Sequence, residues 1–320
     1  MDDLTTLLHD AVSDVEPTDR LAAIREQTRP RRSHRWYAVG GAVLATAAVV
    51  TGIAIAAQPS TDPGPGPGTG TPTAIDSATP STHAVAVYYL GQTPTGPRLF
   101  REFHQRTGAA TLDEALAEVS KKPADPDYVT HWVAGGLGPV TVRDGVIRVD
   151  VFGASVHDQR AGMSAEESEL SIQQVIYTLQ AAAKQRLPVQ FLSDGNPIDT
   201  VYGVPTSEPL ANADQWDVLA LVSVSNPTEG REVEGEFSAD GVASSFEGSV
   251  PWELRDDSGE VVRSGVAQGT MEDHLTPWET GPIDVSDLAP GSYVFEARTD
   301  DPSGGEGGGP TTDTRTITIR

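Results

Sequence analysis

The chain has 320 residues, a formal net charge of −24 and no cysteine. Without cysteine it has neither a disulfide framework nor a thiolate metal site. The acidic excess argues against binding to nucleic acid or to anionic lipid surfaces, because both require clustered lysine and arginine on the protein.

The first residues form an acidic and arginine-rich tail, predicted as a separate segment over 1–35. Within it, Leu4, Leu7 and Leu8 begin an apolar stripe at helical spacing that continues to about residue 28. The stretch resembles the cytoplasmic tails of bacterial membrane proteins linked to alternative sigma factors, anti-sigma-like proteins among them. This resemblance implies a signalling role. The alternative interpretation is a positively flanked start of a membrane anchor.

An uncharged apolar run covers residues 36–57. As a helix with a rise of ~1.5 Å per residue it would be about 33 Å long, enough to cross a hydrocarbon core of ~30 Å. Only a helix satisfies the backbone of one such segment within lipid. We therefore predict a single transmembrane helix at 36–57.

The distribution of arginine predicts the orientation of this helix. Arginines are frequent before the run, whereas the first basic residue after it is Arg98. The positive-inside rule then places residues 1–35 in the cytoplasm and residues 58–320 outside the cell membrane. A cleaved signal peptide is the alternative, because Ala54-Ile55-Ala56 offers a cleavage site, although the apolar run exceeds the usual ~7–15 residues.

Residues 58–82 are rich in proline and glycine and are predicted to be a disordered linker. Beyond it, residues 83–224 combine strand and helix patterns. Alternating apolar residues predict strands near 83–90 and 99–103, and capping boxes predict helices that begin at Thr111 and at Ser164, the second running to about Arg186. Asp-Gly pairs predict hairpin turns at 144–145 and 194–195. We expect two helices on one face of a mixed sheet.

Three stretches of this region carry a family resemblance. They are TLDEALAEV, VRDGVIRVDVFGA and ELSIQQVIYTLQAAAKQRLPVQFLSDGNPIDTV. In this order they resemble the GerMN domain of sporulation and spore-germination proteins, over about residues 83–215. The resemblance implies an α/β module similar to ring-building motifs, with a role in assembly or envelope interaction rather than catalysis.

Residues 225–320 show short alternating runs separated by turns and no helical period, which predicts an all-β sandwich. A hairpin is predicted at 257–259, and the polar loop over 300–312 is expected to be mobile. The stretches NPTEGREVEGEF, FEGSVPWELRDDSGEVV, LAPGSYVFEARTDD and TITIR resemble the Gmad2 domain, an immunoglobulin-like module that follows GerMN in the same class of proteins.

The motifs of common enzyme sites are missing from the sequence. It contains no G-x-S-x-G, phosphate-binding loop or G-x-G-x-x-G motif, and its seven histidines have no metal-ligand spacing. The glycines over 135–138 are interpreted as a loop before a strand, and Asp256, Asp257 and Glu260 as a solvated turn. We therefore predict no catalytic, cofactor-binding or metal-binding residue and no enzymatic activity.

Five aromatic residues are the expected anchors of the two cores. They are Trp132, Trp216, Trp252, Trp278 and Tyr293. Packing is the first interpretation, and binding of a glycan or a partner strand is the alternative.

Together these patterns predict an α+β protein: a transmembrane helix, a GerMN-like α/β domain and an immunoglobulin-like β-sandwich. The expected function is non-catalytic binding or scaffolding in the cell envelope. A protein or wall component is the expected partner, with self-association through sheet edges. One alternative is a transmembrane signalling protein whose tail regulates a sigma factor. The other is a hydrolase of wall polymers, which needs two close carboxylates.

Overall fold

The computed structural model describes residues 82–320 except 154–155, 271 and 302–307. The predicted tail, the transmembrane helix and the linker up to residue 81 lie outside the described residues, as do residues 302–307 of the loop that was expected to be mobile. No helix among the described residues combines the length and hydrophobicity that a membrane crossing needs.

The first domain begins with a long hairpin. Strands β1 (Thr82–Thr93) and β2 (Gly96–Thr107) pair antiparallel along their whole length, and β3 (Tyr128–Val129) adds a short third strand beside β1. Alternate residues of β1 are buried because successive side chains point to opposite faces of a strand. Both strands were predicted from this alternation, and both predictions are confirmed.

A second sheet in this domain contains four strands in the order β4-β5-β6-β7. They are β4 (Leu137–Arg143), β5 (Val146–Val151), β6 (Val189–Ser193) and β7 (Asn196–Pro197). Both predicted Asp-Gly turns are present, with positive φ at Asp144 and Asp194 and at the glycine after each. Strands β5 and β6 are parallel and are joined through a helix, as parallel pairing requires.

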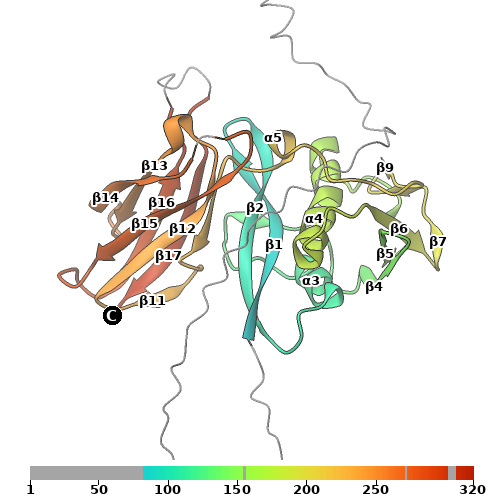
Figure 1. Cartoon of the computed structure of the whole chain (residues 1–320), viewed down its shortest axis with the longest axis horizontal. Helices are drawn as coiled ribbons and strands as arrows, with labels where there is room; N and C mark the ends of the chain where they lie inside the picture. The colour runs from blue at the N-terminus through green and yellow to red at the C-terminus, as the bar shows by residue number, and fades with distance from the viewer. Residues whose placement is uncertain (1–81, 154–155, 271, 302–307) are drawn as a thin grey trace, which may run out of the picture. The chain divides into compact units, whose positions relative to one another are not determined.

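Two helices fill the space between the two sheets (Figure 1). Helix α3 (Leu112–Val119) is capped by Thr111, and α4 (Ala165–Ala183) opens with a complete Ser164–Glu167 capping box. Helix α4 ends three residues before the predicted Arg186, because Lys184 adopts a left-handed conformation with φ 53°. Buried residues occur around most of α4, as expected for a helix covered on two sides.

The expectation of one mixed sheet with both helices on one face is therefore wrong. The larger strands form two sheets. The free edges of the β1–β2 hairpin are hydrogen-bonded to side chains of other elements. The Tyr88 amide of β1 donates to Thr178 Oγ1 of α4 at 3.1 Å. At β2, the Arg101 amide donates to Ser223 Oγ at 3.0 Å, and that hydroxyl donates to the Arg101 carbonyl at 3.2 Å.

The remaining elements of the first domain are short. Strands β8 (Thr200–Val201) and β9 (Val204–Pro205) form a small hairpin, and α5 (Gln215–Val218) is one helical turn. Ser223 belongs to the next strand, β10 (Val222–Asn226), which is the first strand of the second domain's sheet. The predicted junction at 224/225 thus falls inside β10.

The second domain is a β-sandwich of eight strands in the order β10-β12-β15-β14-β13-β16-β17-β11. Besides β10, they are β11 (Arg231–Val233), β12 (Glu236–Ala243), β13 (Ser249–Arg255), β14 (Val261–Gln268), β15 (Thr276–Asp284), β16 (Gly291–Arg298) and β17 (Thr312–Ile319). A single register pair, Gln268 with Glu279, joins β14 to β15. A short 3-10 turn, η2 (Phe246–Gly248), precedes β13. Inward residues of all these strands except β14 alternate into one apolar core, to which β14 adds Ala267.

Strand β15 was not predicted, because Pro277 and Pro282 interrupt its apolar pattern. The register between β12 and β15 shifts between Ser238 and Asp240, close to Pro282. There the Ala239 amide donates to Thr280 Oγ1 at 3.0 Å, which replaces a ladder bond. A bulge of this kind is where a proline is tolerated inside a sheet.

Gly241 offers a test of the packing between β10 and β15. A Cβ atom at this position would overlap the Ser223 carbonyl and lie 2.9 Å from the Trp278 ring. We expect Gly241→Ala to lower the free energy of unfolding by about 3 kcal/mol, as overpacking does at its upper end. Gly291→Ala, where the nearest atom would be 3.9 Å away, is the control and should change it by less than about 1 kcal/mol. Equal stability of the two variants in urea unfolding of the full chain would contradict this packing.

Candidate functional site

Charged residues, several of them buried, form two adjoining clusters in the first domain and at its junction with the second. The first, which we call the His104 cluster, contains Glu102, His104, Arg106, Glu118 and Lys121. Its first three members alternate along β2 and therefore share one face of the strand. Glu118 comes from the last turn of α3 and is 1% exposed.

His104 lies between two carboxylates. Its Nδ1 is 2.7 Å from Glu118 Oε2, and its Nε2 contacts Glu102 Oε1. Burial lowers the pKa of His104, but the hydrogen bonds with Glu102 and Glu118 outweigh burial and raise it. A positive charge on His104 is thus stabilised by the fold.

Glu118 collects the remaining cations of this cluster. Arg106 Nε and Lys121 Nζ each donate to its Oε1 at 2.7 Å. Burial raises the pKa of Glu118, but the hydrogen bonds from Arg106, Lys121 and His104 overcome that effect and lower it to about 2. The carboxylate is therefore held ionised and fully paired.

Glu102 connects this cluster to the interdomain junction. Besides His104, it accepts hydrogen bonds from the amides of Ala124 at 3.0 Å and Asp125 at 3.1 Å. These bonds fix the loop that precedes β3 and present the Asp125 side chain to the second domain.

The second cluster, the Arg315 cluster, contains Asp125, Tyr128, Asp313 and Arg315, all buried. Arg315 Nη1 donates to Asp125 Oδ2 at 2.6 Å and to Asp313 Oδ1 at 2.9 Å, and Nη2 donates to the Val224 carbonyl at 2.8 Å. Tyr128 donates to Asp313 Oδ1 at 2.5 Å, and the Val224 amide donates to Asp313 Oδ2 at 2.6 Å. Asp125 and Tyr128 belong to the first domain, so this ion pair joins the two domains.

Burial dominates the protonation of these carboxyls. It raises the pKa of Asp125 to about 7 against the opposing charge of Arg315, and it also raises the pKa of Asp313. Burial alone would lower the pKa of Arg315, but Asp313, Tyr128 and Asp125 raise it, so the guanidinium stays charged. Both clusters use their polar atoms on internal partners, and the Arg315 cluster also joins the two domains.

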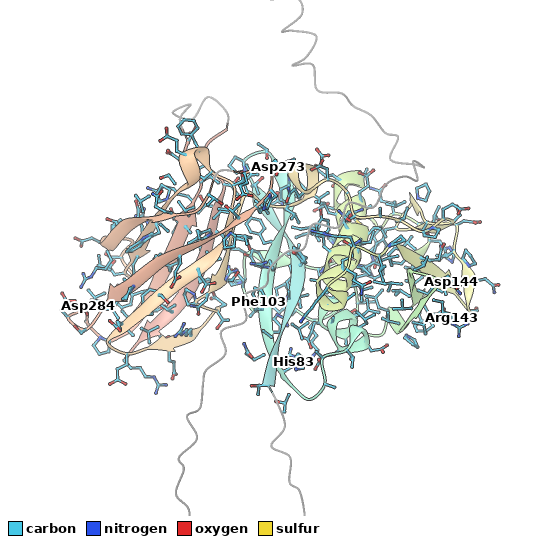
Figure 2. The ribbon with its side chains drawn as sticks, in the orientation of Figure 1. His83, Phe103, Arg143, Asp144, Asp273 and Asp284 are labelled. Carbon is cyan, nitrogen blue, oxygen red and sulfur yellow. The ribbon has the colours of Figure 1, made fainter. Side chains whose placement is uncertain are left out.

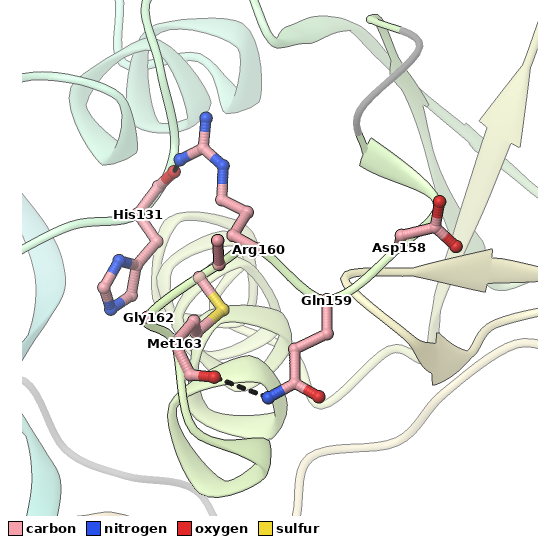
Figure 3. Close-up of a pocket in the computed structure, with 7 residues that line it drawn as sticks. His131, Asp158, Gln159, Arg160, Gly162 and Met163 are labelled. Carbon is pink, nitrogen blue, oxygen red and sulfur yellow. Dashed lines mark hydrogen bonds between the residues drawn. The ribbon is translucent and has the colours of Figure 1, made fainter.

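A surface hollow of about 620 Å³ lies before α4 and is lined by His131, Asp158, Gln159, Arg160, Ala161, Gly162 and Met163 (Figure 3). Its polar side chains do not converge on one point. Arg160 Nη1 donates to the His131 carbonyl and Gln159 Nε2 to the Met163 carbonyl, both at 2.5 Å. Burial lowers the pKa of His131, whose Nε2 is 4.0 Å from Glu167 Oε1. Among the described residues that line the hollow, no nucleophile and base lie within hydrogen-bond reach of each other, which is the geometry that acyl or glycosyl transfer needs.

The other histidines are dispersed. His83 contacts Glu114 Oε2 at 2.6 Å, and His274 lies beside Glu272 and Asp273 on the surface. His157 lies in neither cluster, and His9 and His34 lie outside the described residues. Over the described part of the chain, no set of three or more histidine, aspartate or glutamate side chains is arranged to hold a metal ion.

The loop and turn interpretations made from the sequence agree with the structure. Gly135 and Gly136 form the turn before β4, and Gly138 lies in the first part of that strand, where it packs against the Phe152 ring. Asp256 Oδ1 accepts from the amides of Ser258 and Glu260 at 3.0 and 2.9 Å, which makes an ordinary side-chain-capped turn.

Four of the five aromatic anchors are buried as predicted: Trp132, Trp252, Trp278 and Tyr293. Trp132 also donates from Nε1 to the Ser171 carbonyl at 2.9 Å. Trp216 differs, because it lies on α5 with 40% of its surface exposed. Its core interpretation is wrong, since a one-turn helix cannot bury every side chain that it carries.

The sequence reasoning missed both clusters. A usable signal was present in each case, namely charged residues at alternate positions in or next to a predicted strand: Glu102, His104 and Arg106 in β2, and Asp313 and Arg315 in β17. Charges that occupy the inward register of a strand require partners inside the protein.

Comparison with known proteins identifies both domains. Residues 86–199 match the family model described as sporulation and spore germination, and residues 221–306 match the model described as the immunoglobulin-like domain of bacterial spore germination. The order of the two domains expected from the sequence is confirmed. No curated protein shows significant similarity to the chain.

Solved structures give weaker similarities. The tandem GerMN domains of the sporulation protein GerM from Bacillus subtilis match 45% of this chain at 16% identity with a TM-score of 0.32, and the match covers 49% of that structure. The chain thus spans about half the length of that relative. CopC from Methylosinus trichosporium OB3b matches 31% of this chain and 92% of its own at 18% identity, with a TM-score of 0.23.

The Arg315 cluster predicts a large effect of one substitution. Arg315→Ala leaves Asp125 and Asp313 buried without their cation, and we expect a loss of about 3–5 kcal/mol in the free energy of unfolding. Arg320→Ala is the control, because its pair with Glu232 is exposed and should contribute no more than ~1 kcal/mol. Urea unfolding of the full chain measures both. A loss below 1 kcal/mol for Arg315→Ala would refute the structural role of the cluster.

The His104 cluster predicts a pH-dependent contribution to stability. Because the folded state raises the pKa of His104, its contribution is complete below the unfolded value of ~6.5 and is lost as the pH rises through the folded value. We expect His104→Gln to cost about 2 kcal/mol at pH 6 and progressively less at higher pH.

The matched control is His274→Gln, since His274 also lies beside two carboxylates but is half exposed. Thermal or urea unfolding between pH 6 and pH 9 should show little change for this variant. A cost of His104→Gln that does not depend on pH would contradict the assignment.

Proposed function

We propose that this protein is a membrane-anchored component of the cell envelope whose two domains outside the membrane bind or scaffold a partner and catalyse no reaction. The two family matches relate both domains to sporulation and spore germination. The membrane anchor rests on the predicted helix at 36–57 and on the arginines before it.

The observation that carries the proposal is the joining of the two domains by buried charge. Arg315 and Asp313 of β17 hold Asp125 and Tyr128 of the first domain, and Ser223 of β10 bonds to the edge of β2. A body of fixed geometry presents its surface without an ordering cost on binding, which favours a binding or scaffolding role. Such a junction adds nothing to catalysis by itself.

The topology of the full chain in cells tests the proposal first. We expect a tag inserted near residue 5 to resist external protease and a tag after Arg320 to be digested. Free soluble protein that begins near residue 57 would overturn the anchored form.

Incubation of the purified protein with cell wall tests the absence of turnover. We expect retention of the protein by an envelope fraction without release of soluble fragments. Release that is abolished by one carboxylate substitution would overturn the non-catalytic role and would favour the hydrolase alternative. Capture of a sigma factor by residues 1–35 would instead favour the signalling alternative.

A further inference from the structure

Two large aromatic side chains are exposed at one end of the β-sandwich. Trp216 on α5 is 40% exposed and Phe246 in η2 is 51% exposed. Trp216 and Phe246 lie in different connections between strands, so one irregular loop does not account for the exposure of both.

Hydrogen bonds hold these connections together. Gln215 Nε2 donates to the Asp273 carbonyl at 3.1 Å, which places α5 against the loop before β15 (Figure 2). The Gly269 amide donates to the Gly248 carbonyl at 2.8 Å, which ties η2 to the end of β14. The Asp300 amide donates to Ser245 Oγ at 2.6 Å, which adds the start of the connection between β16 and β17.

Exposed carboxylates flank each aromatic residue in the sequence and also lie on the loop that is hydrogen-bonded to both connections. We call the whole the acidic end surface and define it by Asp214, Trp216, Asp217, Phe246, Glu247, Glu272, Asp273 and Asp300. The sequence has no lysine or arginine over 187–230, 232–254, 264–297 or 299–314, the segments that supply it. Among the described residues, His274 is the single basic side chain that pairs with these carboxylates.

Some other acids of the second domain do have basic partners. Arg255 and Arg298 contact Glu253, Arg263 contacts Asp287, and Arg320 contacts Glu232. The acidic end surface combines carboxylates that have no lysine or arginine partner among the described residues with two exposed aromatic rings.

This combination selects the chemistry of a partner. An arginine or lysine side chain over the face of an indole gains about 0.5–2 kcal/mol, and a carboxylate beside it adds a charge-assisted hydrogen bond. A second copy of this chain would bring acid against acid, and anionic lipid or nucleic acid would be repelled in the same way.

We propose that the acidic end surface binds a lysine- and arginine-rich segment of a partner protein. The inference rests on the binding role proposed above and names the chemical class of the partner. Charge attraction brings the basic segment to the surface, and contacts with Trp216 and Phe246 then hold it in place.

The test titrates the full chain, in nonionic detergent, with a blocked eight-residue peptide of alternating lysine and arginine. At 20 mM salt we expect saturable binding that weakens at least tenfold at 200 mM, because salt screens the attraction. The triple variant Asp217→Asn, Glu272→Gln, Asp273→Asn should bind at least tenfold more weakly than the unaltered chain. Trp216→Ala should weaken binding about threefold or more at unchanged net charge.

The matched control removes three exposed acids from turns elsewhere, in the variant Asp144→Asn, Asp194→Asn, Asp257→Asn. Figure 2 shows Asp144 on the first domain, away from Asp273. This control should bind the peptide as the unaltered chain does. Equal weakening of both triple variants, or no effect of Trp216→Ala, would overturn the surface as a specific site.

The absence of saturable binding at 20 mM salt would also overturn the proposal. So would calcium binding that is lost in the first triple variant and that the peptide does not displace, because it would make the surface a cation site. Envelope retention by the first triple variant, together with lost peptide binding, would support the surface but assign retention to another face. Loss of retention in every variant and in the unaltered chain would instead contradict the proposed binding role.

Discussion

The burial of the Arg315 guanidinium is the constraint on which the relation between the two domains depends. A guanidinium keeps its charge in a protein, and removing it from water costs several kcal/mol unless every donor finds an acceptor. Asp125, Asp313 and the Val224 carbonyl supply those acceptors, and they come from three separate segments. Movement of one domain against the other would break this set, so the ion pair opposes such movement between domains that have separate apolar cores.

The same constraint extends into the first domain through Glu102. Its carboxylate holds the amides of Ala124 and Asp125 and also contacts His104. A change of protonation at His104 therefore alters the partner of the loop that carries Asp125. The effect of burial is overcome in one cluster and prevails in the other. At Glu118 three cations outweigh burial and lower the pKa, whereas at Asp125 burial outweighs the charge of Arg315 and raises the pKa. Glu118 therefore stays ionised over a wide pH range, whereas burial raises the pKa of Asp125 to about 7.

Much of the fold was predictable because it depends on local patterns. The alternation in β1, the capping box at Ser164 and the Asp-Gly turn at Asp144 each fix a short piece of backbone without outside help. The arrangement of sheets was not predictable in this way, since it depends on which side chain forms hydrogen bonds with the backbone at the edge of a strand. Ser223 seals β2 and Thr178 seals β1, and neither residue belongs to a recognisable motif. The site escaped for a related reason: Asp125 and Arg315 are 190 residues apart, and no periodicity links them.

The blocked strand edges also limit how the two domains can bind other molecules. A long open strand would invite pairing with another chain, as the sequence suggested for self-association. The edge of β2 is occupied by Ser223 of β10, and β3 and β7 have two residues each. Strand β14 is longer, but Arg263 crosses its open side to the Asp284 carbonyl and to Asp287. Strand β4 is the exception, because it is an edge strand of seven residues that are mostly exposed. At the other edges strand pairing has little backbone to use, and the exposed aromatic and charged side chains at the end of the sandwich offer a second mode of recognition.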